Sequence, residues 1–546
     1  MLKNSQKASA MTKSIIRKLR RRPLTLALSA LLLSGVISQH AAAQAFPTVI
    51  NLSSLDGTSG FRVDGVATGD LSGHSVSSAG DINGDGLGDL IIGTSSASPN
   101  GLQSACSYVV FGKLGPFAAT SALSSLDGTN GFRLDSLATD DFCGYSVSAA
   151  GDINGDDIDD LIIGAFGASS TGSYSAGSSY VVFGKATPFN ATLALSSLDG
   201  TNGFRLDGTA VLDRSGFSVS AAGDVNGDGH DDLIVGATTA DFNGSQSGSS
   251  YVVFGKATPF AATLALSSLD GTSGFRLDGV ADDRAGRSVS AAGDINGDGL
   301  DDLIIGAPNG ANAPGSSYIV FGKATPFAAN FALSNLNGTN GFRLDGQVVF
   351  DYSGSSVSGA GDINGDGCDD LIIGARGAVA NGMGTGRSFV VFGQTTPFPA
   401  IFALSSLNGS NGFRLDGVEA GDSFGESVSA AGDINGDGRD DLIVGARFAD
   451  PNGFDSGSSY VVFGKATPFA PTLSLSSLDG TTGFRLDGAA IDERAGTSVS
   501  AAGDVNGDGH DDFIIGAPGA ELRPTSAGRS YVVFGRDTGA FKNGFE

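Results

Sequence analysis

Tryptophan is absent from this sequence of 546 residues, which also has only three cysteines, four histidines and 16% charged residues. So few cysteines exclude a disulfide framework, and the spacing of Cys106, Cys143 and Cys368 fits no zinc motif, although a single Cys106–Cys143 bridge stays open. Basic residues are scarce too: residues 1–45 hold eight Lys or Arg and no acid, which leaves 24 basic against 58 acidic residues, a net charge of −34. Such an acidic chain is not expected to bind nucleic acid through a basic patch.

A glycine-rich motif recurs along the chain instead. The 85 glycines are periodic, so they do not indicate low complexity. The motif has nine residues, with Asp at positions 1, 5 and 9, Asn at position 3, and Gly at position 6 in six copies and Asp157 in the other. Successive copies start 71, 72, 70, 68, 71 and 71 residues apart. The seven copies are 81–89, 152–160, 224–232, 294–302, 362–370, 433–441 and 504–512.

Each copy is a candidate cation-binding loop. Short Asp and Asn side chains at positions 1, 3, 5 and 9 can converge on one point, position 7 offers its backbone carbonyl, and Gly at position 6 permits a sharp turn. All-oxygen ligation favours calcium over zinc or copper, and magnesium would keep more water. The sequence therefore predicts up to seven Ca2+ ions, with the ligands Asp81, Asn83, Asp85, Leu87, Asp89, Asp152, Asn154, Asp156, Ile158, Asp160, Asp224, Asn226, Asp228, His230, Asp232, Asp294, Asn296, Asp298, Leu300, Asp302, Asp362, Asn364, Asp366, Cys368, Asp370, Asp433, Asn435, Asp437, Arg439, Asp441, Asp504, Asn506, Asp508, His510 and Asp512.

The motif differs from an EF-hand, because position 12 is apolar (Ile92 in the first copy) and a strand follows instead of a helix. We expect dissociation constants of about 0.1–1 mM, as in extracellular modules. The copy with Asp157 is expected to bind most weakly, because Asp tolerates the left-handed turn less well than Gly. Since position 7 acts through its carbonyl, the side chains of Cys368, His230 and His510 are expected to point into solvent. The alternative is that the loops are ordinary Asn-Gly and Asp-Gly turns.

The first 45 residues have the pattern of a secretory signal peptide. A basic segment ends at residues 20–22, an apolar run covers 24–37, and cleavage is expected after Ala43 or Ala45. The run is too short to span a membrane comfortably, and no later segment resembles a span. We therefore expect a secreted bacterial protein, extracellular, at the cell surface or in the periplasm. An uncleaved anchor is the alternative.

Four strand-like segments recur in each repeat, as at 288–294, 302–307, 249–255 and 274–279. The first has small residues, the second and third are apolar and β-branched as in buried strands, and the fourth alternates Phe and Leu with Arg and Asp as in a half-exposed outer strand. They predict a four-stranded antiparallel sheet in which the stretch between strands three and four packs locally. Seven such sheets predict an all-β fold, a seven-bladed β-propeller over 46–540, with a β-solenoid as the alternative.

The ends of the repeat region predict how the ring closes. Residues 60–65 are a fourth-type strand with no blade before them, and residues 530–535 are a third-type strand with no fourth strand after them. The N-terminal strand is therefore expected to complete the last blade, which removes two free edges. The tail 541–546 lies outside the last blade, and we assign it no role.

Strand direction sorts the connections onto two faces. The motif loops share one face with the connections from strand three to strand four. The opposite face carries the links between blades and the two-to-three loops, which vary most in sequence and are therefore candidates for recognition. These variable loops are 94–105, 165–177, 237–248, 307–315, 375–386, 446–457 and 517–528. Each link also has an acid three positions before a Gly, which either stabilises a turn or forms a second cation or ligand ring: Asp70, Asp141, Asp213, Asp283, Asp351, Asp422 and Glu493.

The repeats resemble FG-GAP repeats, the blades of the integrin α-subunit N-terminal propeller and its bacterial relatives. The resemblance covers about 46–541 and is most specific in the motif followed by Leu-Ile-Ile-Gly-Ala, with Gly-Ala-Pro at 306–308 and 516–518 and Phe-Gly at 424–425. It implies calcium in the loop between strands one and two, ligands at the opposite face and a binding or cell-adhesion role. The other domains of an integrin α chain have no counterpart here, so a β-subunit partner and signalling are not implied.

The chemistry favours a binding module over an enzyme. No Cys–His or Ser–His–Asp arrangement is apparent, and no Gly-rich phosphate loop precedes a helix. The repeats also fill nearly all of the 501 residues that follow Ala45. We therefore expect a monomer that binds a protein or glycan ligand through its variable face and has no catalytic residues. A secreted hydrolase that uses loop carboxylates, and a structural component of an envelope or matrix, are the alternatives.

Overall fold

The computed structural model describes residues 45–97, 106–136, 139–169, 175–257, 259–308, 313–466, 468–519 and 527–538. The chain divides into two compact units, 1–44 and 45–546, and the architecture below is that of the second. The expected signal peptide lies outside the described residues except for Ala45, and so does the tail 541–546. Within the described ranges, no helix has the length and apolar character needed to cross a membrane.

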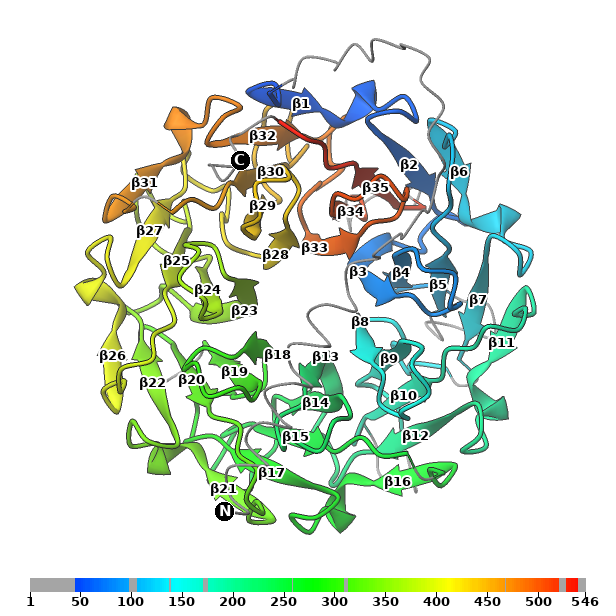
Figure 1. The fold of residues 1–546 in the computed structure, drawn as a ribbon, viewed down its shortest axis with the longest axis vertical. Coiled ribbons are helices and arrows are strands. Elements are labelled where there is room, and N and C mark those ends of the chain that lie inside the picture. Colours follow the sequence, from blue (N-terminus) through cyan, green and yellow to red (C-terminus); the bar gives the residue numbers. More distant parts are fainter. Residues whose placement is uncertain are drawn as a thin grey trace, which may run out of the picture. The chain divides into compact units, whose positions relative to one another are not determined.

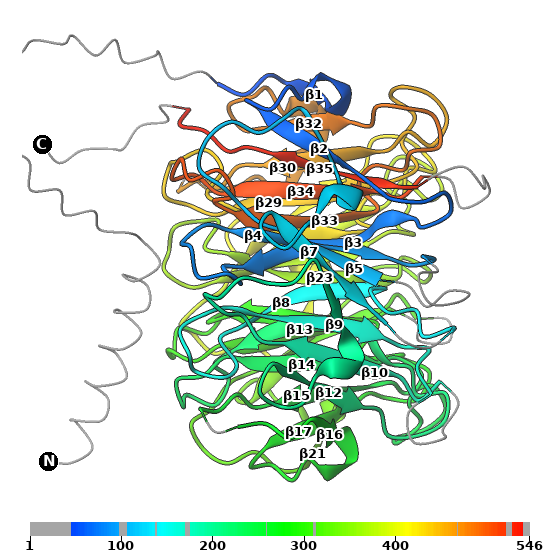
Figure 2. The ribbon, with the colours of Figure 1, turned by 90° about the vertical axis from the view of Figure 1, so that its right-hand side faces the viewer.

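Seven five-stranded β-sheets are arranged around a common axis as the blades of a propeller (Figure 1). We number the blades 1–7 after the motif loop that each carries. In every blade four strands are antiparallel, in the order expected from the sequence, and a fifth is parallel at the outer edge. Seen at right angles to the axis, the strands run between two faces where the connections gather (Figure 2). The prediction of an all-β, seven-bladed β-propeller is confirmed, with five strands per blade instead of four.

The innermost strands consist of small residues because seven of them surround one axis. In blade 4, Val289 and Ala292 are buried, and Ser288 is half-buried. These strands are sheet edges, and in six blades a side chain of the preceding blade satisfies part of the edge: the N–H of Val357 in blade 5, for example, donates to Ser288 Oγ at 3.1 Å. The innermost strands of blades 1–7 are β3 (Ser72–Gly80), β8 (Ser146–Gly151), β13 (Ser215–Gly223), β18 (Ser288–Gly293), β23 (Ser353–Gly361), β28 (Val428–Gly432) and β33 (Ser498–Gly503).

The second and third strands are covered on both faces by the adjacent blades. All residues of the second strands are buried, which confirms the interpretation of their continuous apolar runs. The second strands are β4 (Asp89–Thr94), β9 (Asp160–Ala165), β14 (Asp232–Ala237), β19 (Asp302–Ala307), β24 (Asp370–Ala375), β29 (Asp441–Ala446) and β34 (Asp512–Ala517). The third strands are β5 (Cys106–Val110), β10 (Ser178–Val182), β15 (Ser249–Val253), β20 (Ser316–Val320), β25 (Arg387–Val391), β30 (Ser458–Val462) and β35 (Arg529–Val533).

The fourth strands alternate as expected for outer strands. In blade 4, Phe342 and Leu344 are buried, while the guanidinium of Arg343 forms an ion pair with Asp345 at 2.6 Å. The fourth strands of blades 1–7 are β7 (Gly131–Asp135), β12 (Gly203–Asp207), β17 (Gly274–Asp278), β22 (Gly341–Asp345), β27 (Gly412–Asp416), β32 (Gly483–Asp487) and β2 (Gly60–Asp64).

The expectation that the three-to-four connection packs locally is wrong. Part of this connection leaves its own blade and pairs in parallel with the fourth strand of the preceding blade, as in the pairs Arg343–Ile401 and Asp345–Ala403. The physical reason is that the fourth strand would otherwise leave a row of unpaired backbone groups at the edge. These fifth strands, for blades 1–7, are β11 (Thr192–Ala194), β16 (Thr263–Ala265), β21 (Asn330–Ala332), β26 (Ile401–Ala403), β31 (Thr472–Ser474), β1 (Val49–Asn51) and β6 (Thr120–Ala122).

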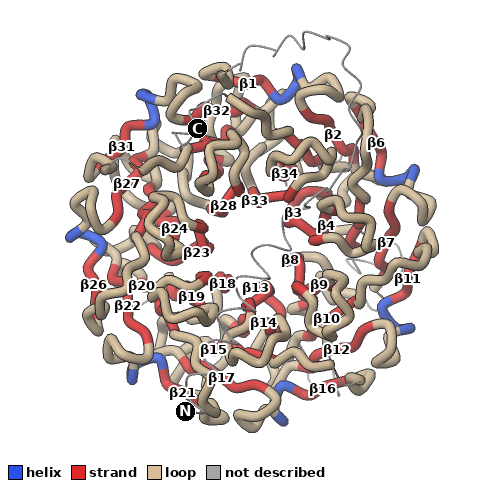
Figure 3. Tube along the Cα trace, in the orientation of Figure 1, coloured by secondary structure: helices blue, strands red, loops and turns tan. Residues whose placement is uncertain are grey.

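A three-residue 3-10 helix follows each of these fifth strands and lies at the rim of the ring (Figure 3). The leucine of each helix is buried and attaches the rim to the core; Leu404, for example, is only 1% exposed. The helices are η1 (Leu52–Ser54), η2 (Leu123–Ser125), η4 (Leu195–Ser197), η5 (Leu266–Ser268), η6 (Leu333–Asn335), η7 (Leu404–Ser406) and η8 (Leu475–Ser477).

The hydrophobic core is divided into seven clusters, each of which joins neighbouring blades. One recurrent contact is an aromatic stack: Phe327, from a three-to-four connection, lies on Phe275 of the preceding blade with ring centroids 4.2 Å apart. The same stack occurs seven times, with centroid distances of 4.2–4.6 Å. Apolar burial between blades therefore holds the ring together.

A backbone hydrogen bond repeats beside each aromatic stack. The N–H of Lys323, just after the third strand of blade 4, donates to the carbonyl of Val225 in the motif loop of blade 3 at 2.9 Å. The equivalent bond links all seven pairs of adjacent blades at 2.8–2.9 Å. The motif loops are therefore attached to the ring by their backbone at position 2.

The N-terminal segment closes the ring. Strand β2 pairs antiparallel with β35, which confirms the predicted closure. Strand β1 also pairs with β32 of blade 6, and Phe46 stacks on Phe484 of that blade. The guanidinium of Arg536 lies 4.2 Å from the ring centroid of Phe46, where other blades place a Lys over the equivalent Phe. The first described residues thus supply most of the three-to-four connection of blade 7.

The three cysteines are buried free thiols. The Cys106–Cys143 bridge that the sequence left open is therefore not formed in this structure.

Candidate metal centres and the opposite face

The seven motif loops connect the first and second strands of the blades, and their backbone holds the acidic side chains. In blade 4, the Asp294 carboxylate accepts the N–H groups of Asp298 at 2.9 Å and Gly299 at 2.8 Å. The Asp298 carboxylate accepts the N–H of Leu300 at 3.1 Å. Positions 1 and 5 are therefore oriented by the loop itself, which is the local reason for short Asp side chains there.

Position 9 is the first residue of the second strand and is buried. Asp302 is 0% exposed and accepts the N–H groups of Gly322 at 2.8 Å and Ile295 at 3.2 Å. The side-chain Nδ2 of Asn296, at position 3, donates to the same carboxylate at 3.2 Å. The other end of that amide is an oxygen, so position 3 retains an acceptor of the kind that calcium prefers.

The electrostatics of position 9 are the same in every blade. Burial raises the pKa of this carboxylate, and the carboxylates at positions 1 and 5 raise it further. The pKa is raised to about 8 for Asp89, Asp160, Asp370 and Asp512, and lies well above its usual value for Asp232, Asp302 and Asp441. A divalent cation among these groups would offset their mutual repulsion.

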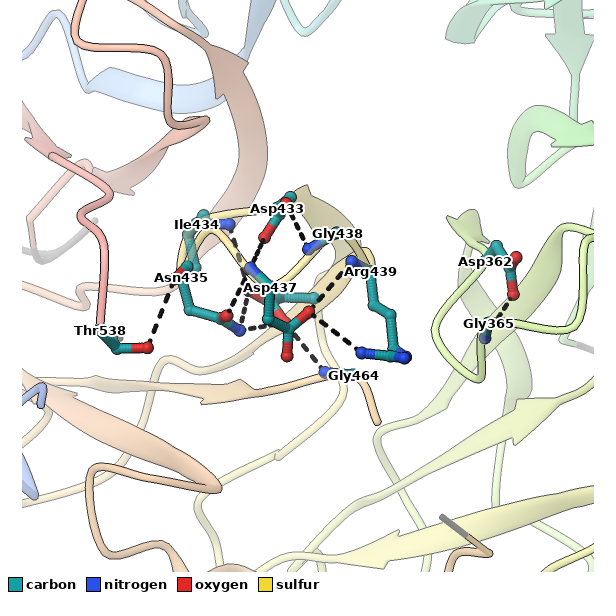
Figure 4. A network of polar contacts seen from close by, with 11 residues as sticks. Asp362, Gly365, Asp433, Ile434, Asn435, Asp437, Gly438, Arg439, Gly464 and Thr538 are labelled. Atoms are coloured by element: carbon teal, nitrogen blue, oxygen red, sulfur yellow. Dashed lines mark hydrogen bonds and ion pairs between the residues drawn. The ribbon is translucent and has the colours of Figure 1, made fainter. Parts of the chain in front are cut away.

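The loop of blade 6 contains its own positive side chain (Figure 4). Arg439 at position 7 places its guanidinium 3.7 Å from the Asp437 carboxylate. Asn435 at position 3 is 2% exposed, and its backbone carbonyl accepts the N–H of Thr538 at 3.3 Å. The Arg439 side chain also reaches toward the loop of blade 5, where Gly365 lies. A cation in the blade 6 loop would therefore meet a competing charge.

The expectation that position-7 side chains point into solvent is wrong. Cys368 is only 4% exposed, and His230 and His510 are half-buried. Each packs against the Gly at position 4 of the preceding loop: a Cβ at Gly155 would lie 2.5 Å from the His230 ring. The reason is that adjacent loops lie side by side around the ring, and glycine leaves room for the neighbour's side chain.

Position 6 adopts a left-handed conformation in every blade, including the one without glycine. Asp157 has φ +67°, and its N–H donates to the Asp152 carboxylate at 2.9 Å, as Gly299 does to Asp294. The turn is therefore kept at an energetic cost, since non-glycine residues rarely adopt this conformation.

Position 8 is not among the predicted ligands, yet it makes a contact between blades. The Asp301 carboxylate of blade 4 accepts the N–H of Asp224, the first residue of the blade 3 loop, at 2.8 Å. The signal in the sequence is an Asp-Asp pair at positions 8 and 9 in six of the seven copies, with Gly88 in the first. Ligand spacing alone does not distinguish this Asp from an ordinary surface residue.

The donor set of the loops fits a hard divalent cation. Each loop offers three carboxylates, an amide and a backbone carbonyl, without a thiol or imidazole ligand among the side chains at positions 1, 3, 5 and 9. Among the described residues, no group of three or more His, Cys, Asp or Glu is already arranged so that it could hold a metal ion. Convergence of the four side chains on one ion therefore stays a prediction.

The opposite face carries the acids of the links between blades, and their contacts are those of turn residues. Asp213 is 4% exposed, and its carboxylate accepts the N–H of Ala210 at 2.9 Å. Its backbone carbonyl accepts the N–H of Thr239, from a two-to-three loop, at 3.4 Å. Burial raises the pKa of Asp213 and of Asp422 to about 6. These contacts favour turn stabilisation over a second cation ring.

Exposed apolar side chains gather on the same face. Of the sixteen large hydrophobic side chains that are exposed among the described residues, all but Val49, Leu114 and Ile401 lie in the blade links or the two-to-three loops. We call these thirteen residues the apolar crown: Val66, Val211, Leu212, Phe242, Val280, Val348, Val349, Phe350, Val379, Met383, Val418, Phe454 and Ile491. Exposed apolar side chains that are concentrated on one face are typical of an interaction surface.

Aromatic residues also collect where the first strands of blades 1–3 begin, at the axial end of this face. The Tyr145 ring lies 4.6 Å from His74 and 5.1 Å from Phe217, measured between centroids. Arg287 of blade 4 places its guanidinium 4.4 Å from the Phe217 ring centroid. In blades 5–7 the equivalent position holds Ser, Glu and Thr. At this position the ring is therefore aromatic in blades 1–3 and polar in blades 4–7, which the sequence pattern did not indicate.

A protein-family model described as FG-GAP repeat matches the chain seven times, at 72–105, 144–182, 215–253, 285–320, 353–391, 424–462 and 495–533. Each match includes a motif loop and the second strand that follows it.

Similar proteins include several integrin α chains. The chain is 28% identical to integrin alpha-PS2 of Drosophila melanogaster over 230 residues, which is 41% of this chain and 14% of that protein. It is 30% identical to integrin alpha-V of Gallus gallus over 243 residues, 44% of this chain and 20% of that protein. It is 30% identical to integrin alpha pat-2 of Caenorhabditis elegans over 275 residues, 49% of this chain and 21% of that protein. The matches therefore span about a fifth or less of these relatives.

Proposed function

This chain belongs to the FG-GAP repeat proteins and has an integrin α-like propeller, and from that premise we propose that it is a secreted, calcium-stabilised binding or adhesion module. In this proposal the motif loops hold calcium, and a protein or glycan ligand binds at the opposite face.

The calcium part of the proposal is supported by the repeated loop. Seven loops have the same oxygen donors, and in each the pKa of the position-9 carboxylate is raised by burial and by the carboxylates at positions 1 and 5. When bound, calcium would supply positive charge to these carboxylates. Asp and Asn side chains would hold it together with the position-7 carbonyl. The loop's own backbone N–H groups already orient the carboxylates at positions 1 and 5.

One observation carries the binding part of the proposal: the apolar crown lies on one face, in the connections whose sequences vary from blade to blade. Met383 is 85% exposed, Phe454 66% and Ile491 59%. Solvent exposure of such side chains is unfavourable without a compensating role. A large surface of this kind on a rigid ring suits a macromolecular ligand better than a small molecule.

Secretion is proposed from the N-terminal segment. Residues 1–45 have the basic, apolar and alanine-rich parts of a signal peptide in the expected order. Millimolar calcium outside the cell would match the weak affinity expected of loops without a bidentate Glu.

The test is capture of ligands by the mature protein on a glycan array and on immobilised extracellular matrix proteins, with calcium and with chelator. A variant with Met383→Ser, Phe454→Ser and Ile491→Ser is expected to lose binding, because it removes three exposed apolar contacts from one face. The matched control is Leu114→Ser with Ile401→Ser, which removes exposed apolar side chains (74% and 54% exposed) outside that face. Binding that is equal in both variants would contradict the assignment of the ligand face.

A further inference from the structure

We propose that the Asp at position 8 of six motif loops is a positioning residue for the cation site of the preceding blade, and that the interface between blades 7 and 1, where position 8 is Gly88, lacks this carboxylate. The inference rests on the proposed calcium sites and concerns residues that do not bind the ion themselves. The six residues are Asp159, Asp231, Asp301, Asp369, Asp440 and Asp511.

The contact is the same at six interfaces. The position-8 carboxylate accepts the backbone N–H of the position-1 Asp in the preceding blade at 2.8–2.9 Å. In blades 3, 4, 5 and 7, the N–H of the position-8 residue also donates to the carbonyl of that position-1 Asp at 3.2–3.4 Å. At these four interfaces, both the N–H and the carbonyl of the first predicted ligand are therefore hydrogen-bonded to the next blade.

The backbone of the preceding blade is shaped to receive this carboxylate. Gly223, which precedes the position-1 Asp224, has φ +69°, and a Cβ there would lie 2.4 Å from Asp301 Oδ2. At the other five interfaces the corresponding distance is 2.2–2.5 Å. The carboxylate therefore occupies the space that a side chain would need, and glycine is required both for the turn and for this contact.

Position 1 connects this contact to the cation site. The N–H of Asp224 is bound by Asp301, while its carboxylate accepts the N–H groups of Asp228 at 3.0 Å and Gly229 at 2.8 Å. The direction of the Asp224 side chain is therefore set jointly by its own loop and by the next blade. Groups that orient a metal ligand in this way commonly change metal affinity by about 10–100-fold when they are removed.

The interface between blades 7 and 1 is different. Position 8 of blade 1 is Gly88, whose N–H donates to the carbonyl of Asp504 at 2.9 Å, but which has no carboxylate to receive the Asp504 N–H. A Cβ at the adjacent Gly503 would have the Gly88 Cα as its nearest atom, 3.8 Å away, in place of the carboxylate found at the other interfaces. The loop of blade 7 is thus the one whose first ligand lacks the support from the following blade.

The inference is tested with Asp301→Ala, Asp301→Asn, the ligand variant Asp228→Ala in the blade 3 loop, and the double variant Asp301→Ala with Asp228→Ala. Bound calcium is measured by equilibrium dialysis near the wild-type dissociation constant, and Tm is measured in calcium and in chelator. Asp301→Ala is expected to weaken one site about 10–100-fold. Asp301→Asn is expected to weaken it less, because its Oδ1 still accepts the N–H. In the Asp228→Ala background, Asp301→Ala is expected to remove no further calcium.

Two controls separate positioning from general loss of stability. Asp270→Ala changes an exposed turn carboxylate of blade 3 that contacts Thr272 and Ser273, and is expected to leave bound calcium unchanged. Asp508→Ala removes a ligand of the blade 7 loop and is expected to cost less bound calcium than Asp228→Ala, because that loop already lacks support.

The outcomes distinguish this inference from the function on which it rests. Wild-type calcium binding with no change in Asp301→Ala, or an equal further loss in the Asp228→Ala background, would overturn the positioning role alone. Absence of calcium binding by the wild type would overturn the proposed function and the inference with it.

Discussion

The two faces of the propeller differ in what their connections contact. On the motif-loop face, side chains and backbone are bound to their own loop and to the next blade, and the seven copies are nearly identical. On the opposite face, the connections differ between blades, and thirteen large apolar side chains are exposed. Backbone hydrogen bonds still join adjacent blades on this face, as from the N–H of Ser215 in blade 3 to the carbonyl of Ala176 in blade 2 at 3.0 Å. The side chains of these connections can therefore vary without loss of the links between blades.

The comparison also shows two uses of buried carboxylates. At the motif loops, burial and the carboxylates at positions 1 and 5 raise the pKa of the position-9 carboxylate, which favours a bound cation. In the links of the opposite face, one buried carboxylate accepts a backbone N–H and completes a turn. The same residue type is thus a predicted ligand on one face and a structural acceptor on the other.

Removal of calcium, which would bind only at the motif-loop face, is expected to change the stability of the fold most. At tenfold excess over the dissociation constant, each filled site would add about 1.4 kcal/mol, so seven independent sites would add about 10 kcal/mol. Calorimetry should show a clear rise in Tm with calcium that chelator reverses. If Tm is the same in calcium and in chelator, the loops are ordinary turns.

The aromatic stacks between blades should give the next largest effect. Phe275→Ala removes a ring that is 1% exposed and stacked on Phe327, and is expected to cost about 3–5 kcal/mol of unfolding free energy. Phe454→Ala, on the opposite face at 66% exposure, should change it by less than about 0.5 kcal/mol. Chemical denaturation of both variants measures the difference, and equal effects would contradict the contrast between core and crown.

The buried acid at Asp213 should make the opposite face sensitive to pH. Its pKa is raised to about 6, so its stabilising contribution is present below about pH 4 and is lost as the pH rises through about 6. Asp213→Asn keeps the acceptor for the Ala210 N–H without the charge. Its Tm relative to wild type should therefore increase between pH 5 and pH 8, at constant calcium.

The control for this pH dependence is Asp270→Asn. Hydrogen bonds from Thr272 lower the pKa of Asp270, so its ionised form is the stabilising one, and the substitution should give no gain between pH 5 and pH 8. A gain of the same size in both variants would contradict the assignment to burial.

The smallest predicted effect concerns the left-handed residue of the blade 2 loop. Asp157→Gly relieves a φ of +67° and should stabilise the fold by about 1 kcal/mol or less. In calcium it should also strengthen the site that the sequence predicts to be weakest. Thermal melts with and without calcium measure both effects, and a loss of stability would show that the Asp157 charge matters more than the strain.

Much of the fold could be predicted because the same signals recur seven times. Alternating residues such as Phe342 and Leu344 predicted an outer strand, and the unmatched segments at 60–65 and 530–535 predicted the closure by β2 and β35. The predicted ligands fall in one loop type, and positions 1, 5 and 9 are held there by backbone N–H groups.

Other contacts could not be predicted, because they join residues from different blades. The fifth strand pairs Ile401 with Arg343, the Cys368 side chain packs against the preceding loop, and Asp301 binds the N–H of Asp224. In the sequence, Ile401 looks like part of a loop, Cys368 like a residue that offers only its carbonyl oxygen to a cation, and Asp301 like an acid on the surface. Their partners are defined only when adjacent blades are in place.

By itself the sequence determined the repeating unit: its strands, its turn at each motif, and the oxygen donors offered to a cation, since all of these depend on neighbouring residues and local periodicity. Tertiary structure decided what each unit touches in the next, including which carboxylates act between blades and which apolar side chains stay exposed. The physical reason is that burial and edge pairing are properties of the closed ring, in which each blade covers the surface that its neighbour would otherwise leave to water.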